Sequence, residues 1–185
     1  MPADLYPFIN EGYRAMVFVD GENLAIRYGG AKKQLGSPEK SGVVHIPNVA
    51  VWLPVLSPPN SSLSGTRVIR KHYYTSVPAG DPPKLAEVRE KLKQQGFEAP
   101  NVFPKDKTKG SKRVDISLTT DMLLHAARKH YDIAVLVAGD EDYVPLVRAV
   151  KSEGARVHVW FLSNGLNPAL RGESDYFVDL DEYLL

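Results

Sequence analysis

The chain has 185 residues, which suits one domain and suffices to bury a hydrophobic core without disulfides or structural metal ions. Its formal net charge is +1 and it contains no cysteine, so a polyanion would have to bind at a local patch, and thiolate catalysis, zinc–thiolate sites and disulfides are excluded. The first residues lack the features of a signal peptide, and no apolar run approaches the roughly 18–20 residues that span a bilayer. We therefore expect a soluble, cytoplasmic protein with one domain over residues 1–185 and no membrane partner.

Strand-like and helix-like segments alternate along the sequence. Runs of β-branched and aromatic residues predict strands, apolar residues at helical spacing predict helices, and segments rich in Gly, Pro and Ser predict loops. In the first half of the chain we expect a strand at 16–20, the start of a helix at 22–28, a loop at 29–42, a short helix within 50–56, a loop at 57–65, a strand at 67–75 and a helix at 82–95. In the second half we expect a weak strand at 97–103, a basic loop at 105–113, a helix at 114–129, a strand at 133–138, a helix at 142–153, a strand at 156–161, a helical turn near 167–171 and a short apolar run at 176–180.

This alternation predicts a three-layer α/β/α sandwich around a mainly parallel sheet. Consecutive parallel strands require crossover connections, and these are nearly always right-handed. The runs at 17–19 and 133–138 are almost entirely apolar, which is typical of strands covered on both faces. In such sheets ligands bind beyond the carboxyl ends of the strands.

Acidic residues stand where two of these strands end. Asp20 follows V-F-V, and Asp140 and Asp142 follow V-L-V-A-G. One Asp at each place could simply cap the next helix. Capping does not require both Asp140 and Asp142, however, and carboxylates that share a crevice repel one another unless protons or cations neutralise them. We therefore expect a site for a hard cation here, with Glu141 facing solvent.

Further polar residues are candidates for the same site. Asn23 lies one helical turn after Asp20 and can direct its amide toward the same point. Asp115 begins the helix that follows the basic loop, which makes it a good candidate ligand. Asp121 shares a helix face with core positions and with His125, so a place in the site and a place at the wet edge of the helix both remain open.

These residues favour metal-dependent hydrolysis over other chemistries. Oxygen ligands suit Mg²⁺ or Mn²⁺. Such an ion can polarise a phosphoryl oxygen and lower the pKa of a bound water. The sequence contains no Ser/His/Asp set, P-loop or HExxH motif. Hydrolysis of a phosphodiester is therefore the predicted reaction, while a small phosphate ester remains an alternative substrate.

Five basic residues lead into Asp115 and are candidates for substrate binding. They are Lys105, Lys107, Lys109, Lys112 and Arg113. A run of charges is usually just a solvated loop. Next to the proposed metal site, the same run could position phosphate groups. The histidines, both tryptophans and the Tyr73–Tyr74 pair are better explained as structural residues.

Several motifs resemble those of the NYN domain, a branch of the PIN-like nucleases that includes LabA-like proteins. They are V-D-G-E-N (19–23), K-R-V-D-I-S-L-T-T-D-M-L (112–123), V-A-G-D-E-D-Y-V-P-L (137–146), G-A-R-V-H-V (154–159) and D-Y-F-V-D-L (175–180). The resemblance implies a PIN-like α/β/α sandwich with divalent-metal-dependent ribonuclease chemistry. It places Asp20, Asn23, Asp115, Asp140 and Asp142 in the acidic site and matches Asp121 to a recurring helix position.

The hypothesis from the sequence is a Mg²⁺- or Mn²⁺-dependent endoribonuclease. Asp20, Asp115, Asp140 and Asp142 would hold the metal, with Asp121 as a further candidate. Asn23 would orient a ligand or the scissile phosphate, and the basic loop would position RNA. The segment 29–65 departs from the family as an apparent insertion that could gate the site, bind a protein partner or form a homo-oligomer contact. An adaptor that binds RNA or protein without cleavage is the alternative from another functional class.

Overall fold

The computed structural model describes residues 12–56, 66–105 and 112–185. The strands are β1 (Arg14–Asp20), β2 (Val44–Ile46), β3 (Ala50–Trp52), β4 (Arg67–Pro78), β5 (Asn101–Lys105), β6 (Ile133–Val137), β7 (Arg156–Phe161) and β8 (Tyr176–Asp179). The α-helices are α1 (Gly21–Leu35), α2 (Pro82–Gln94), α3 (Lys112–Ala127), α4 (Val144–Ser152), α5 (Pro168–Glu173) and α6 (Asp181–Leu184). Three 3-10 turns complete the described elements: η2 (Pro54–Leu56), η3 (Glu141–Tyr143) and η4 (Ser163–Gly165).

Six strands form one sheet in the order β5-β4-β1-β6-β7-β8, and all of its pairings are parallel. Strands β2 and β3 form a separate antiparallel hairpin. The expected α/β architecture with a mainly parallel sheet is confirmed. Every residue of β6 is buried, as the continuous apolar run at 133–137 predicts for a strand covered on both faces.

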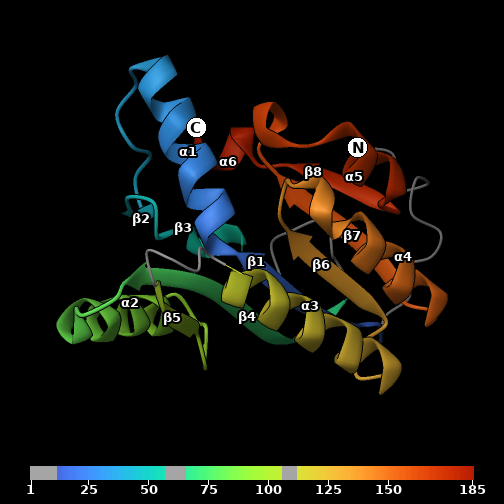
Figure 1. Cartoon of the computed structure of the whole chain (residues 1–185). Helices are drawn as coiled ribbons and strands as arrows, with labels where there is room; N and C mark the ends of the chain where they lie inside the picture. Colours follow the sequence, from blue (N-terminus) through green and yellow to red (C-terminus); the bar gives the residue numbers. More distant parts are fainter. Residues whose placement is uncertain (1–11, 57–65, 106–111) are drawn as a thin grey trace.

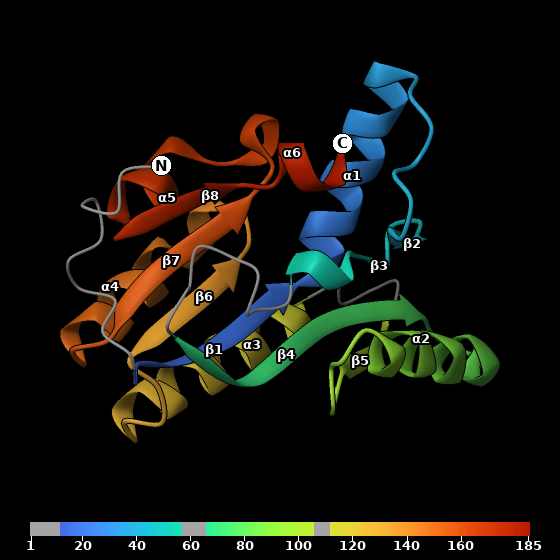
Figure 2. The same cartoon turned by 180° about the vertical axis from the view of Figure 1, so that it is seen from behind.

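Helices cover both faces of the sheet and create two apolar cores. One core joins α3, α4 and α5 to one face, with Leu118, Met122 and Val147 among its buried residues. The other joins α1, α2, α6 and the β2–β3 hairpin to the opposite face. Figure 1 shows α3 and α4 crossing in front of the sheet. Figure 2, seen from behind, shows β7, β6, β1 and β4 in front of these two helices.

The order of the strands places a topological switch between β1 and β6. From the central strand β1 the chain continues to β4 and β5 on one side, and then crosses to β6, β7 and β8 on the other. Connections that leave adjacent strands in opposite directions open a crevice beyond the carboxyl ends of those strands. Asp20 ends β1 and Asp140 follows β6, so the fold brings these two carboxylates to the same crevice.

Two expectations for residues 29–56 are wrong. The first part of the loop expected at 29–42 is helical, because α1 continues to Leu35, where Gly36 ends it with a φ of 62°. The segment predicted as a short helix contains strand β3 instead, followed by the turn η2. Tertiary contacts explain the strand, because the Tyr73 hydroxyl hydrogen-bonds both the amide and the carbonyl of Val51.

Other boundaries shift by a few residues. The strand expected at 97–103 lies at Asn101–Lys105, so Lys105 belongs to β5, opposite Pro78, and not to the basic loop. Helix α3 begins at Lys112, and the helix expected at 142–153 divides into η3 and α4. The predicted loop at 57–65 and most of the predicted basic loop lie outside the described residues. None of the described helices is both long and apolar enough to cross a membrane.

Candidate active site

An open cavity of about 130 Å³ lies at the switch between β1 and β6. Its lining combines the ends of these strands with the first turns of α1 and α3. The lining residues are Asp20, Glu22, Asn23, Ile26, Val114, Asp115 and Asp140. The sequence predictions for Asp20, Asn23, Asp115 and Asp140 thus fall on one cavity.

Asp20 is the most deeply buried carboxylate of this cavity, with 3% of its surface exposed. It caps α1, because its Oδ1 accepts a hydrogen bond of 3.0 Å from the Asn23 amide nitrogen. Burial is the main cause that raises the pKa of Asp20 to about 7; the hydrogen bonds from Asn23 and Tyr143 oppose this rise, and the charges of Asp115 and Asp140 contribute to it. A cation beside this group would favour its ionised form.

Tyr143 connects two carboxylates through one hydroxyl. Its Oη donates to Asp20 Oδ2 at 2.8 Å and lies 3.4 Å from Asp115 Oδ1. Partial burial raises the pKa of Asp115, and the charges of Glu22, Asp140 and Asp142 add to this effect. Tyr143 therefore holds α3 and β1 in register at the cavity.

Asn23 fixes the position of Asp140. Its Nδ2 donates to Asp140 Oδ2 at 2.6 Å, and its Oδ1 accepts from the Gly139 amide nitrogen at 3.0 Å. Arg27, one turn further along α1, places a guanidinium nitrogen 3.8 Å from Asp140 Oδ1. The amide of Asn23 is thus occupied by the protein itself and orients a carboxylate of the site.

Two glycines, Gly139 and Gly21, allow neighbouring segments to pack closely against the backbone next to Asp140 and Asp20. A Cβ on Gly139 would lie 2.3 Å from the Phe161 ring and 2.5 Å from the Gly165 carbonyl oxygen. A Cβ on Gly21 would lie 2.0 Å from the Tyr73 ring. The glycines of the G-D and D-G motifs are therefore required by packing next to Asp140 and Asp20.

Glu22 is a site residue that the sequence analysis missed. It is buried, accepts a hydrogen bond of 2.6 Å from the Ser76 hydroxyl and forms an ion pair with Lys105. Lys105 is itself 40% exposed at this edge of the sheet. Glu22 is part of the D-G-E-N motif, but only the structure shows that its side chain faces the ends of β4 and β5.

The remaining predicted residues lie around the cavity or apart from it. Asp142 is exposed and is absent from the lining, and Glu141 is exposed, as expected. Asp121 is also absent from the lining, and its Oδ2 accepts a hydrogen bond of 2.8 Å from the Tyr74 hydroxyl. Arg113 is exposed in the first turn of α3. Lys107, Lys109 and the Lys112 side chain lie outside the described part of the chain.

Comparison with known proteins identifies the family of the chain. The model of the NYN domain matches residues 14–181, which is nearly the whole chain. The chain belongs to the NYN domain family. A crystal structure of a protein of unknown function from Vibrio parahaemolyticus RIMD 2210633 has a similar fold, with a TM-score of 0.67, 20% sequence identity and coverage of 100% of both chains. A search of curated proteins finds no match.

NYN domains are generally nucleases of the PIN-like type, and PIN-like nuclease domains typically use divalent metal ions. In the described residues, no three His or acidic side chains are arranged as a complete metal site. The donors nevertheless suit a hard cation: Asp20, Asp115 and Asp140 supply only oxygen, and a small cation such as Mg²⁺ keeps several waters beside one or two carboxylates. The raised pKa of buried Asp20 is the mark of a negative charge that lacks compensation.

Proposed function

We propose that this NYN domain is a divalent-metal-dependent endoribonuclease whose site is the cavity around Asp20. The observation that carries the proposal is the position of buried Asp20 between the charges of Asp115 and Asp140, at the switch point of the sheet. Mg²⁺ or Mn²⁺ held by these carboxylates, with Asp142 at the rim, would polarise a phosphodiester oxygen and lower the pKa of a water molecule.

The residues of the chain would supply position and charge. Asn23 holds Asp140 toward the cavity, and Tyr143 holds Asp20 against Asp115. Lys105 pairs with Glu22 at the cavity, and exposed Arg113 lies two residues before Asp115 in α3; both would contact phosphates of the bound strand. Lys107, Lys109 and Lys112 are proposed for the same role from their place in the sequence.

The size of the cavity favours a polymer over a small phosphate ester. Pockets that enclose a small-molecule ligand usually measure about 300–1,000 Å³. The acidic cavity measures about 130 Å³ and is open to solvent. It accommodates one phosphate group and an ion, while the rest of the substrate would lie across the surface.

The test is cleavage of a labelled circular RNA with Mg²⁺, Mn²⁺ or EDTA, because only an endonuclease opens a circle. Wild type, Asp140→Asn and Asp179→Asn would be prepared identically, the last being an exposed carboxylate at the end of β8. We expect metal-dependent opening by wild type and Asp179→Asn, and at least a hundredfold loss in Asp140→Asn, in the range of removed electrostatic groups.

Three results would contradict the proposal. Equal cleavage by Asp140→Asn would place the activity elsewhere or in a contaminant. RNA binding without cleavage in either metal would support the adaptor. Turnover of a mononucleotide phosphate ester, but not of RNA, would support a small-molecule phosphohydrolase.

A further inference from the structure

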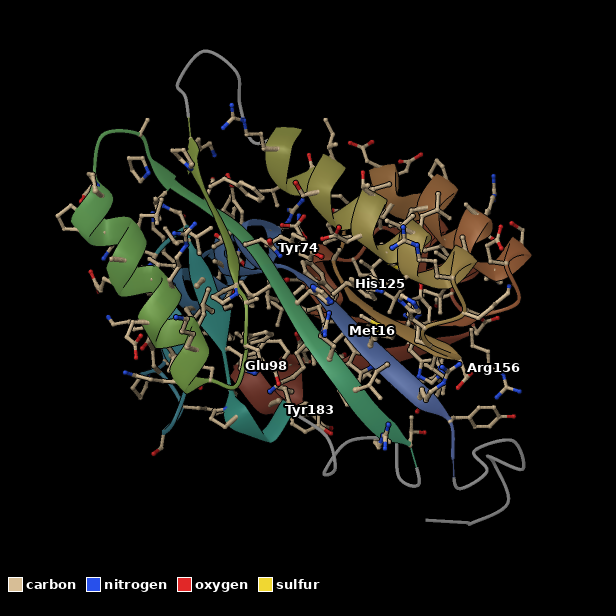
Figure 3. All side chains as sticks on the ribbon, turned by 90° about the horizontal axis from the view of Figure 1, so that it is seen from below. Met16, Tyr74, Glu98, His125, Arg156 and Tyr183 are labelled. Atoms are coloured by element: carbon tan, nitrogen blue, oxygen red, sulfur yellow. The ribbon has the colours of Figure 1, made fainter. Side chains whose placement is uncertain are left out.

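A second and larger cavity lies near the amino ends of β1 and β4, under the last turns of α3. Its volume is about 440 Å³, within the range of ligand-binding pockets. Three arginines line it, Arg14, Arg67 and Arg70, together with His125 and His130. Met16 contributes an apolar wall, and Figure 3 shows Met16 and His125 in the space between the sheet and α3.

Among the described residues, the lining of this cavity contains no acidic side chain. Arg14 is compensated by Asp132, with a distance of 3.1 Å between Nη2 and Oδ1. Arg67 and Arg70, in contrast, have no carboxylate within ion-pair distance among the described residues. Two uncompensated guanidinium groups at the mouth of one cavity produce a local positive potential in a protein of net charge +1.

A β-bulge brings an additional side chain to the cavity. The pairing of β1 with β4 shifts between Ala15 and Met16, so that Ala15 is opposite Val68 and Met16 is opposite Arg70. Regular alternation would put Ile69 and Arg70 on opposite faces of the sheet. Both line the cavity instead, which shows that the bulge re-aims one of them. Bulges of this kind recur beside functional sites.

Two histidines face each other at the end of α3, His125 within the helix and His130 just beyond it. The Nδ1 atoms of His125 and His130 are 2.8 Å apart, so one ring donates a hydrogen bond to the other. His72, which stacks on Phe18, has a buried Nε2 with no hydrogen-bond partner in the described part of the chain. Burial lowers the pKa of His72 and His125, and Arg70 adds to this effect against the opposing charge of Asp121. Neutral imidazole N–H groups and guanidinium forks both donate hydrogen bonds to anions.

We propose that this cavity is a phosphate-binding site for a nucleotide, either free or within an RNA strand. Arg70 and Arg67 would contact the phosphate, and the apolar wall of Met16 and Ile69 would lie against the nucleoside. Arginine presents a planar fork that matches phosphate oxygens. The site is separate from the acidic cavity, so it can exist whether or not the chain cleaves RNA.

A purely structural role for Arg67 and Arg70 is the alternative that the experiment must distinguish from phosphate binding. Strand β5 pairs only with residues 74–78 of β4, which leaves the first half of β4 as a sheet edge. Charged residues commonly protect such edges from aggregation. Edge protection requires charge alone and predicts no saturable binding of phosphate.

The experiment is a calorimetric and NMR titration of the full chain in EDTA with inorganic phosphate, adenosine 5′-monophosphate and adenosine. The variants are Arg70→Gln and Arg148→Gln, two exposed arginines of which only the first lines the cavity. We expect saturable binding of the monophosphate, at least fivefold tighter than adenosine. We expect Arg70→Gln to weaken it at least fivefold and Arg148→Gln to leave it within twofold.

Absence of saturable binding, or equal weakening by both variants, would overturn the proposal. Chemical-shift changes confined to the acidic cavity would also overturn it. A titration with single-stranded RNA then identifies the source of the phosphate. Tighter binding of RNA than of the monophosphate, lost in Arg70→Gln, identifies a strand, and the reverse order identifies a free nucleotide.

Discussion

Helix α3 runs between two cavities whose linings carry opposite charge. Its first turn contributes Asp115 to a small acidic cavity, whereas His125 in its last turns and His130 just beyond its end line a larger cavity that also contains three arginines. Ten residues of helix separate Asp115 from His125, or about 15 Å at 1.5 Å per residue. The carboxylates are held by polar partners, whereas Arg67 and Arg70 have no acidic partner among the described residues. The net charge of the protein is therefore close to zero although the acidic and basic cavities have local potentials of opposite sign.

The largest expected effect concerns the pH dependence of stability at the acidic cavity. The pKa of Asp20 is raised to about 7 from an ordinary value near 3.8, so the folded protein binds more protons than the unfolded chain between these values. Stability must therefore fall as pH rises through this window. In EDTA, Asp20→Asn should gain up to roughly 4 kcal/mol relative to wild type between pH 4 and pH 8. Urea unfolding across pH measures this difference.

The matched control is Asp132→Asn beside the basic cavity. The hydrogen bond and charge of Arg14 lower the pKa of Asp132, so its stabilising effect is present near neutral pH and is lost as pH falls below the ordinary value. The two variants should thus differ from wild type with opposite dependence on pH. If the stability differences of the two variants from wild type changed with pH in the same direction, the opposite pKa shifts of Asp20 and Asp132 would be contradicted.

Gly139→Ala tests whether packing positions the acidic loop. The new Cβ would meet the buried Phe161 ring and a backbone carbonyl, neither of which can move freely, so we expect a loss of about 3 kcal/mol. Gly172→Ala is the control, because nothing lies within 4 Å of a Cβ at this helical position. It should stabilise the protein by up to about 1 kcal/mol. Equal unfolding midpoints for the two variants would contradict the close approach at Gly139.

Tyr143→Phe tests the hydroxyl that joins Asp20 to Asp115. Its loss should raise the pKa of Asp20 further and cost about 1–2 kcal/mol, because a buried acceptor loses its donor. RNA cleavage should fall at least tenfold, as for groups that orient metal ligands. Tyr28→Phe removes a buried hydroxyl without a partner in the described residues and should leave both quantities unchanged. Unaltered cleavage by Tyr143→Phe would refute its positioning role.

Lys105→Gln is expected to have the smallest effect. If Lys105 contacts an RNA phosphate, its loss should reduce the salt dependence of RNA binding by about one unit of slope. The measurement uses the Asp140→Asn background to prevent cleavage. Lys91→Gln breaks a comparable lysine–glutamate pair on α2 and should not change the slope. An equal change in both variants would assign the effect to overall charge.

The sequence was sufficient to predict those features that the residues of a single strand determine. Apolar runs ending in Asp20 and Asp140 predicted buried parallel strands and the edge at which the carboxylates meet. It was insufficient where a partner from another segment decides the structure. Strand β3 depends on β2 and Tyr73, and the length of α1 depends on burial of Tyr28 and Ala31.

The same reason explains the missed site residues. Glu22 is recognisable only once Ser76 and Lys105 lie beside it, and Tyr143 only once its hydroxyl reaches Asp20. The basic cavity combines two strands, a bulge and the end of α3, so no local motif could predict it.

The central position of β1 has a consequence for synthesis of the chain. This strand is made before both of its neighbours, which lie about 50 and 120 residues later in the chain. Until β6 has left the ribosome, one edge of this largely apolar strand lacks its partner from β6, and unpaired edges promote aggregation in nascent chains. The Asn23–Asp140 contact likewise spans 117 positions. The acidic cavity can therefore form only after residue 140 has been made, so any activity that depends on this cavity would be absent from the nascent chain until then.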